Sequence, residues 1–159
     1  MWKKFTFFMT MLILFSVTIS LVITNYGNLP NKIPTHFDAS GRPDSRRSKK
    51  MILVFPSAQI LFLILSLVFY RHPDFVNIPG TIALKDLPTH LKERMYELIR
   101  NTIFITTSIL SLLMLYLTEE TLKVAKGQAM SINDWGVLAI LICLALPMAY
   151  NAIKMRRLR

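Results

Sequence analysis

Cysteine is nearly absent from the 159-residue sequence: only Cys143 is present, and it lies inside an apolar run. One thiol cannot form an intrachain disulfide, and it cannot supply the several thiolates of a zinc cluster. We therefore predict that Cys143 is a small packed residue of a helix. The sequence also lacks an HExxH-like pair, a phosphate-binding loop and a recognisable nucleophile motif, so it supports no catalytic assignment and no cofactor.

Acidic residues are scarce as well. The chain has 9 Asp and Glu against 19 Lys and Arg, which gives a net charge of +10. That excess suits either nucleic acid or an anionic membrane surface. Hydrophobic residues make up 53% of the chain and the mean hydropathy is +0.44, which is more apolar surface than a soluble domain of this size can hide. Because the basic residues lie between apolar runs and no nucleic-acid-binding module is visible, we expect membrane lipid as a partner and no nucleic acid.

Charged residues are missing entirely from four long stretches, residues 5–24, 51–70, 101–118 and 135–153. About 20 apolar residues suffice for a helix to cross a bilayer, and backbone groups in lipid must bond within their own segment. We predict an all-α integral membrane protein with four transmembrane helices in a single membrane domain. A signal peptide is the alternative for the first stretch, which is long for one and is followed by no small-x-small cleavage pattern.

The positive charges of the connections predict the orientation. With the N-terminus inside, the cytoplasmic side carries eleven Lys and Arg and the outer side carries eight. We expect a multi-pass protein of the cell membrane with both termini cytoplasmic and the connection over residues 25–50 outside the cytoplasm. Six cations in that connection oppose the rule, so we expect another interaction to hold it in place.

Residues 87–100 follow a helical period before the third stretch. The apolar stripe of this segment consists of Leu87, Leu91, Met95, Leu98 and Ile99. We predict an amphipathic interfacial helix, capped by Asp86, that runs on into the third span. Residues 119–134 carry no recognisable chemistry, and we expect a solvated connection with Asn133 or Asp134 as the cap of the fourth helix.

Three residues inside the spans differ from their apolar neighbours. Pro56 and Pro147 are each predicted to remove a backbone donor and bend a helix. Gln59 is the most polar side chain placed well inside a span, and we expect it to form an interhelical hydrogen bond. A functional pathway through the membrane is the alternative interpretation of Gln59.

The connection over residues 25–50 is rich in conformational constraints, namely Pro30, Pro34, Gly41 and Pro43. Each proline restricts its own φ and the residue before it, so we predict a fixed irregular path in place of disorder. Residues 38–41 are expected to form a tight turn with Gly41 at a positive φ. That turn would return His36 and Phe37 towards Pro43 and Asp44.

A histidine and a carboxylate brought together in this way allow several chemistries. His36 could carry a proton while Asp44 orients it, or the two could bind a metal together with Asp38. Three ligands are the usual minimum for a zinc site. The simplest alternative is a hydrogen bond from His36 to Asp44 that closes the loop, and the sequence leaves the presence of a metal open.

The same segment resembles a known family. The pattern runs through Leu29-Pro30, Ile33-Pro34-Thr35-His36-Phe37, Gly41, Pro43-Asp44 and Ser48-Lys49, with Pro56 in the next span. It is similar to the membrane domain of unknown function at the N-terminus of SdpI-type immunity proteins. Ser45-Arg46-Arg47 stand where members often have Gly-Trp-Gly-like residues. The resemblance implies a multispan membrane protein of a Gram-positive-like bacterium with the motif loop outside the cytoplasm.

These observations support three hypotheses. In the first, the outer loop recognises a peptide, a lipid headgroup or a membrane partner, with immunity to a membrane-active peptide toxin as one form. The expected binding residues are Pro30, Pro34, His36, Phe37, Asp38, Gly41, Pro43, Asp44 and Lys49. The second hypothesis is a membrane-surface enzyme or metal site that uses His36 and Asp44. The third is an accessory subunit of a membrane complex or transporter, or a homo-oligomer. We favour the first and expect no catalytic activity.

Overall fold

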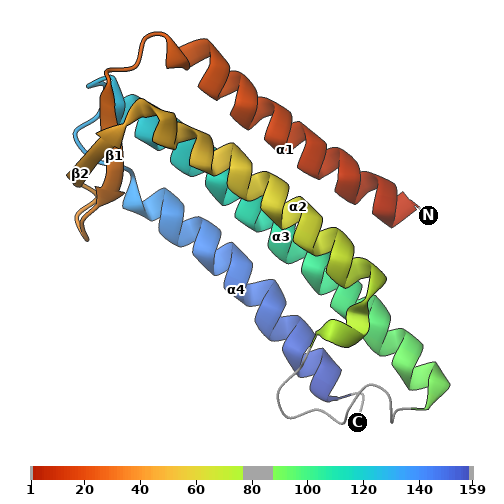
Figure 1. Cartoon of the computed structure of the whole chain (residues 1–159). Helices are drawn as coiled ribbons and strands as arrows, with labels where there is room; N and C mark the ends of the chain where they lie inside the picture. The colour runs from red at the N-terminus through yellow and green to blue at the C-terminus, as the bar shows by residue number, and fades with distance from the viewer. Residues whose placement is uncertain (1, 77–87, 158–159) are drawn as a thin grey trace.

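The structure is a computed structural model that describes residues 2–76 and 88–157. Its elements are α1 (Trp2–Tyr26), β1 (Lys32–Phe37), β2 (Pro43–Ser48), η1 (Lys49–Leu53), α2 (Val54–Arg71), η2 (Pro73–Phe75), α3 (Thr89–Ala125) and α4 (Asp134–Arg156). The long helices run side by side, and the hairpin of β1 and β2 lies across one end of the bundle (Figure 1). α1 begins and α4 ends at the opposite end of the bundle.

Four helices of the described chain are long and apolar enough to cross a membrane. Many of their apolar side chains face outward, and Ile13, Leu61 and Leu146 are each more than half exposed. A bundle that presents this much hydrocarbon is stable in lipid, where its helical backbone groups are already satisfied. The prediction of an all-α, four-span membrane protein is confirmed.

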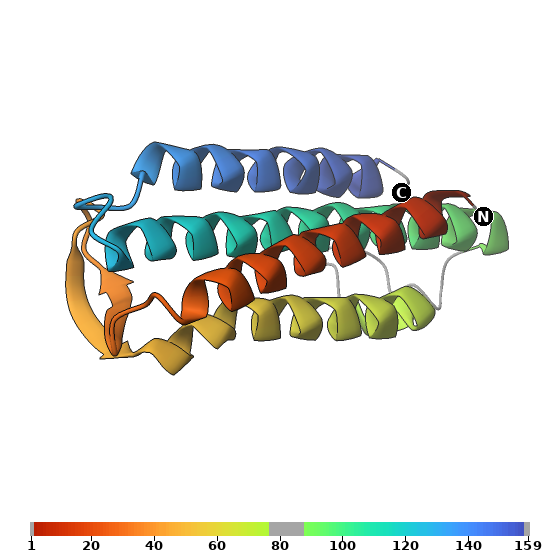
Figure 2. The same ribbon diagram turned by 90° about the horizontal axis from the view of Figure 1, so that it is seen from above.

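α3 is the central helix of the bundle. It packs against α1, α2 and α4, and α4 lies on the side of α3 that faces away from α2 (Figure 2). α4 is therefore covered on one side only, and its buried residues are Asn151 and Met155. The rest of α4 is available to lipid.

α3 begins at Thr89 and continues without a break to Ala125. The predicted amphipathic segment therefore does run on into the third span, whereas Asp86 and Leu87 lie outside the described residues. Met95, Leu98 and Ile99 of the predicted stripe are buried and pack with Met155 of α4. Because α4 ends beside the first turns of α3, this part of the stripe is covered by protein.

The two helix prolines differ in their positions. Pro56 is the third residue of α2, which follows the short helix η1. η1 runs directly into α2, and Leu53 and Val54 both have helical backbone conformations. Pro56 therefore removes one backbone donor, as predicted, close to the helix start, where proline is best tolerated. Pro147 lies inside α4 as predicted.

Gln59 ties three helices together near the middle of the bundle. Its side chain is 2% exposed, and its Nε2 donates to Thr18 Oγ1 of α1 and to the Ser111 carbonyl of α3, each over 2.9 Å. In hydrocarbon these donors have no water as an alternative partner. The predicted interhelical hydrogen bond is confirmed.

Replacing Gln59 with methionine keeps the side-chain volume but removes both donors. We expect the Gln59→Met variant to lose about 1 kcal/mol of unfolding free energy, a typical value for interhelical hydrogen bonds in membranes. Reversible unfolding in mixed micelles measures the loss. Ser57→Ala, at an exposed position two residues earlier on α2, is the control and should leave stability unchanged. Equal stability of Gln59→Met and the unmodified chain would contradict this role.

Candidate functional site

Residues 32–48 form a two-stranded antiparallel hairpin. Lys32 pairs with Ser48 and Phe37 with Pro43, and the register shifts between Pro34 and His36. The predicted irregular path is therefore wrong. Prolines favour an extended conformation at the preceding residue, and neither strand of a two-stranded sheet needs every N–H for pairing. The proline restrictions are thus compatible with strands.

Asp38 organises the turn of the hairpin. Its Oδ1 accepts hydrogen bonds from the Ser40 backbone N at 2.8 Å, from Ser40 Oγ at 2.7 Å and from the Arg42 backbone N at 3.0 Å. Gly41 has a φ of +72°, as expected for this tight turn. The bonds lower the pKa of the Asp38 carboxyl below its ordinary value of 3.8, and the Ser40 hydroxyl has the largest effect.

Gly41 also docks the turn onto the connection between α3 and α4. The Ile132 N–H donates to the Gly41 carbonyl over 2.9 Å. A Cβ on Gly41 would lie 2.7 Å from the Ile132 carbonyl oxygen and 2.8 Å from Asp134 Oδ1. Only glycine can meet both the positive φ and this close approach.

Glu120 holds the other side of this contact. The side chain is 6% exposed, and its Oε2 accepts a hydrogen bond of 2.8 Å from the Asn133 backbone N. Tyr116 Oη donates to the Asn133 carbonyl over 2.9 Å, and Asn133 caps α4 through the Trp135 N–H. The predicted cap is confirmed, but the expectation of a merely solvated connection is wrong because a buried carboxylate anchors it.

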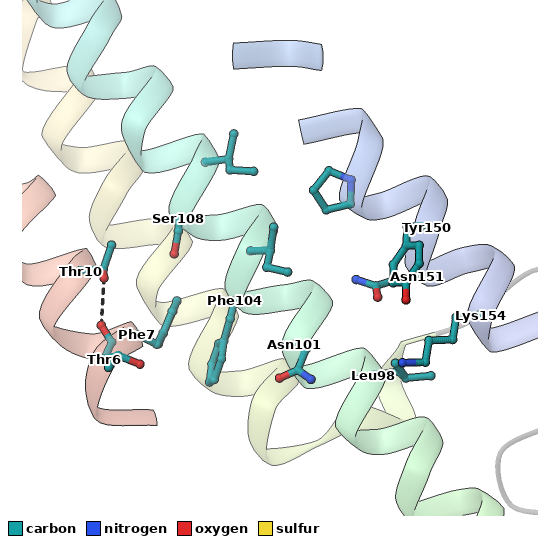
Figure 3. Close-up of a pocket in the computed structure, with 13 residues that line it drawn as sticks. Thr6, Phe7, Thr10, Leu98, Asn101, Phe104, Ser108, Tyr150, Asn151 and Lys154 are labelled. Atoms are coloured by element: carbon teal, nitrogen blue, oxygen red, sulfur yellow. Dashed lines mark hydrogen bonds between the residues drawn. The ribbon is translucent and has the colours of Figure 1, made fainter. Parts of the chain in front are cut away.

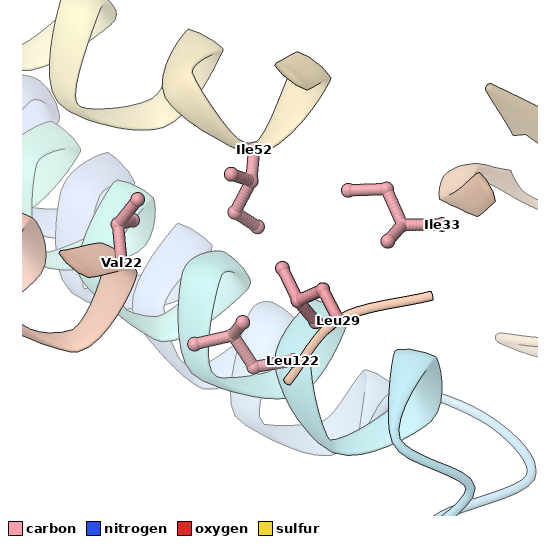
Figure 4. Packing of buried hydrophobic residues seen from close by; sticks show 5 residues of the cluster. All are labelled: Val22, Leu29, Ile33, Ile52 and Leu122. Atoms are coloured by element: carbon pink, nitrogen blue, oxygen red, sulfur yellow. The ribbon is translucent and has the colours of Figure 1, made fainter. Parts of the chain in front are cut away.

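The base of the hairpin is held by a small apolar core and by Lys49. The core cluster consists of Val22, Leu29, Ile33, Ile52 and Leu122 (Figure 4). Lys49 Nζ donates to the Tyr26 carbonyl over 3.4 Å and lies 4.9 Å from the centre of the Tyr26 ring. Contacts to α1 and α3, together with the chain's own continuation into η1, therefore fix the hairpin at its base.

His36 and Asp44 meet on the outer side of the hairpin. His36 Nδ1 lies 2.6 Å from Asp44 Oδ1, and the side chains are 70% and 46% exposed. The predicted pairing of these residues is confirmed. An oriented imidazole at this position can carry a proton or donate to an acidic ligand.

The described residues contain no group of three or more His, Cys, Asp or Glu side chains arranged to hold a metal ion. The hypothetical ligand set of His36, Asp38 and Asp44 therefore does not assemble. Asp38 Oδ1 is already occupied by the turn. His72 lies at the end of α2 and His90 at the start of α3, at the opposite end of the bundle from the hairpin (Figure 1).

The remaining motif residues fall into two groups. Pro34 and Gly41 are buried, whereas Phe37, Pro43 and Lys49 are half-buried and Pro30 is exposed. The cations around them face outward: Lys32, Arg42, Arg46, Arg47 and Lys50 are all exposed. The hairpin thus combines a fixed backbone with a positively charged outer surface. Glu120 and Tyr116 were not among the site residues predicted from the sequence. The available signal was that the two residues lie one helical turn apart near the end of a helix.

Glycine is required at position 41 for two reasons, the positive φ and the close contact, and substitutions at three glycines distinguish them. Gly27 has neither a positive φ nor a neighbour within 4 Å of an added Cβ, Gly127 has only a positive φ, and Gly41 has both. We expect Gly27→Ala to be nearly neutral, and Gly127→Ala to cost about 1 to 2 kcal/mol of unfolding free energy. Gly41→Ala should cost more than Gly127→Ala. Equal losses at positions 41 and 127 would show that the close contact at Gly41 adds nothing.

The lowered pKa of Asp38 predicts that the free energy of unfolding depends on pH. A carboxyl with a lower pKa in the folded than in the unfolded chain stabilises the fold fully above its unfolded pKa, near 3.8. That contribution is lost as the pH falls through the folded pKa. The unmodified chain should therefore be more stable than Asp38→Asn at pH 7, with a smaller difference at pH 3 in the same micelles. A difference independent of pH would mean that the charge of Asp38 does not stabilise the turn.

Comparison with known proteins matches residues 11–60 to the family model of a domain of unknown function, DUF1648. This range covers most of α1, the whole hairpin and the start of α2. An uncharacterized protein of Archaeoglobus fulgidus is 35% identical over 66 residues, a match that spans 36% of this chain and 36% of that relative. No solved structure matches the chain. The similarity to DUF1648 and the four apolar helices together support a multispan membrane protein whose hairpin segment resembles a domain of unknown function.

Proposed function

We propose that the chain is a membrane-anchored recognition module. Its hairpin binds an acidic group on a peptide, a lipid headgroup or a membrane partner at the membrane surface, and it does so without catalysis. The observation that carries this proposal is the combination of a hairpin fixed at its base and at its turn with an outward-facing set of cations. A surface ordered before binding loses less conformational entropy when a ligand arrives.

The charges on the hairpin favour an acidic ligand. Residues 32–50 contain six Lys and Arg and two Asp. Both carboxylates are engaged within the hairpin, Asp38 with its turn and Asp44 with His36. In the described part of the chain, Arg46 and Arg47 take part in no ion pair. Two unpaired guanidinium groups at an exposed site attract carboxylates and phosphates and can bind them with two parallel hydrogen bonds.

Immunity to a membrane-active peptide toxin is the biological form of this function that we propose. The resemblance to SdpI-type immunity proteins supports it, since the motif residues of that resemblance build the hairpin, its turn and its base. A hairpin that captures an acidic segment of a toxin at the membrane surface would keep the toxin from inserting.

A membrane-surface enzyme is the second candidate, and one observation favours it: the 2.6 Å contact between His36 and Asp44. A carboxylate that orients an imidazole is the arrangement of a general base and its partner. The same contact also closes the hairpin between its strands. His36→Gln separates the two roles, because glutamine can donate a hydrogen bond to Asp44 but cannot act as a general base.

The recognition function predicts a charge-dependent protection. A sensitive strain that lacks the protein should become resistant to a membrane-active peptide when the chain is expressed, and Arg46→Ser/Arg47→Ser should abolish most of the resistance. Arg156→Ser/Arg157→Ser removes the same charge at the opposite end of the bundle and is the matched control. It should protect like the unmodified chain at equal membrane abundance.

Three outcomes would contradict the proposal. Unchanged killing curves on expression of the chain, across a panel of such peptides, would contradict the immunity form. For the broader form, binding of acidic peptides and of anionic headgroups to the purified chain would be measured at low and high salt. Binding that is insensitive to salt, or equal in the two double variants, would show that the hairpin cations do not recognise the ligand.

A further inference from the structure

A groove lies at the end of the bundle opposite the hairpin. α3 forms its floor, and α1 and α4 form its two sides. The groove has a volume of about 680 Å³. Figure 3 shows Asn151 and Lys154 projecting from α4 towards α3, while Thr6 and Thr10 lie on α1 across the groove.

Asn151 is the unusual residue of the groove. It is 7% exposed and is one of two buried residues on α4. In the part of the chain that the structure describes, its amide forms no hydrogen bond, and neither does the half-buried amide of Asn101 on α3. The fully buried side-chain polar atoms without a partner in the described residues are Thr35 Oγ1 and Gln59 Oε1, so the two groove amides are not among the enclosed atoms, and in hydrocarbon they have no water to bond. A ligand in the groove would supply the missing partners.

The charge of the groove indicates the polarity of that ligand. Among its described lining residues Lys154 is the one charged side chain, and no carboxylate is present. Lys154 lies in the last turn of α4, where the helix leaves the hydrocarbon. It forms no ion pair within the described chain; its Nζ lies 6.0 Å from the Tyr150 ring centre. The amine and the Asn151 amide are three residues apart and so lie on one face of the helix.

The rest of the groove is mostly apolar, with the hydroxyls of Thr6, Thr10, Ser108 and Tyr150 among its lining. Phe104, Ile105 and Ile109 of α3 line it towards the middle of the bilayer. The groove therefore changes along its length from a cation and amide donors at the helix ends to a mainly hydrocarbon lining in the interior, where Ser108 adds one hydroxyl. An amphipathic anion with acyl chains matches this order, and basic pockets between transmembrane helices are known to bind anionic headgroups.

We propose that this groove binds one anionic phospholipid. The phosphodiester would accept hydrogen bonds from Lys154 Nζ and the Asn151 amide, and an acyl chain would lie along α3 between α1 and α4. The bound lipid would fill the space that separates α4 from α1. This site is independent of the hairpin proposal, because it lies at the other end of the bundle and shares no residue with it.

The test uses the purified full chain and two lipids of equal acyl chains, phosphatidylglycerol and phosphatidylcholine. Native mass spectrometry measures the dissociation constant of each lipid. The unmodified chain should bind phosphatidylglycerol about fivefold more tightly, which corresponds to one Lys near an anionic headgroup. Lys154→Gln should remove this preference, and Asn151→Leu should weaken binding of both lipids because both contain the phosphodiester.

Two control variants distinguish lipid binding in the groove from general attraction of anionic lipid to the cations of the chain. Arg157→Gln removes a cation from the same end without touching the groove and should bind both lipids like the unmodified chain, as should the hairpin variant Arg46→Ser/Arg47→Ser. Should Asn151→Leu fail to fold, Ile105→Trp at an exposed groove position replaces it. This variant must weaken the binding of both lipids. The proposal is overturned if the unmodified chain shows no preference, if Lys154→Gln keeps it, or if Arg157→Gln loses it equally.

Discussion

The close contact at Gly41 joins two parts of the chain that are far apart in sequence. The first part consists of α1, the hairpin and α2. The second part consists of α3, α4 and the connection between them. At Gly41 the turn of the hairpin bonds to Ile132 and lies against Asp134. Without it, the hairpin would be held only at its base, and its outer surface would lose its fixed position relative to the helices. The proposed recognition depends on that position.

The docking of the turn requires that the connection after α3 be fixed as well. Glu120 provides this, since its buried carboxylate accepts from the Asn133 N–H and from Lys123 Nζ. A carboxylate at the end of a membrane helix is costly to bury unless such donors satisfy it. The polar contacts at this end of the bundle thus form a continuous set from Asp38 in the turn to Glu120 in α3.

The opposite end of the bundle is built differently. Phe104 of α3 stacks on Phe7 of α1 and on Tyr70 of α2, with ring centres 4.0 Å and 5.1 Å apart. These rings bring α1, α2 and α3 together but leave α4 on the far side of α3. The groove between α1 and α4 is a consequence of this arrangement, and it is lined by the exposed Lys154 and the largely buried Asn151. The hairpin end therefore presents a rigid polar surface, whereas the other end presents an amphipathic cleft.

The sequence alone determined the membrane architecture, because long runs without charge can be satisfied only by helices in lipid. It also placed Gly41 in a tight turn and brought His36 to Asp44, since these are local consequences of a short chain reversal. It did not predict that the constrained segment forms strands, because the restrictions that its three prolines impose are compatible with extended and irregular paths alike. Partners at long sequence separation, such as Gly41 with Ile132 or Met155 with Ile99, were decided only by the packing of the helices, for which no residue spacing carries a signal.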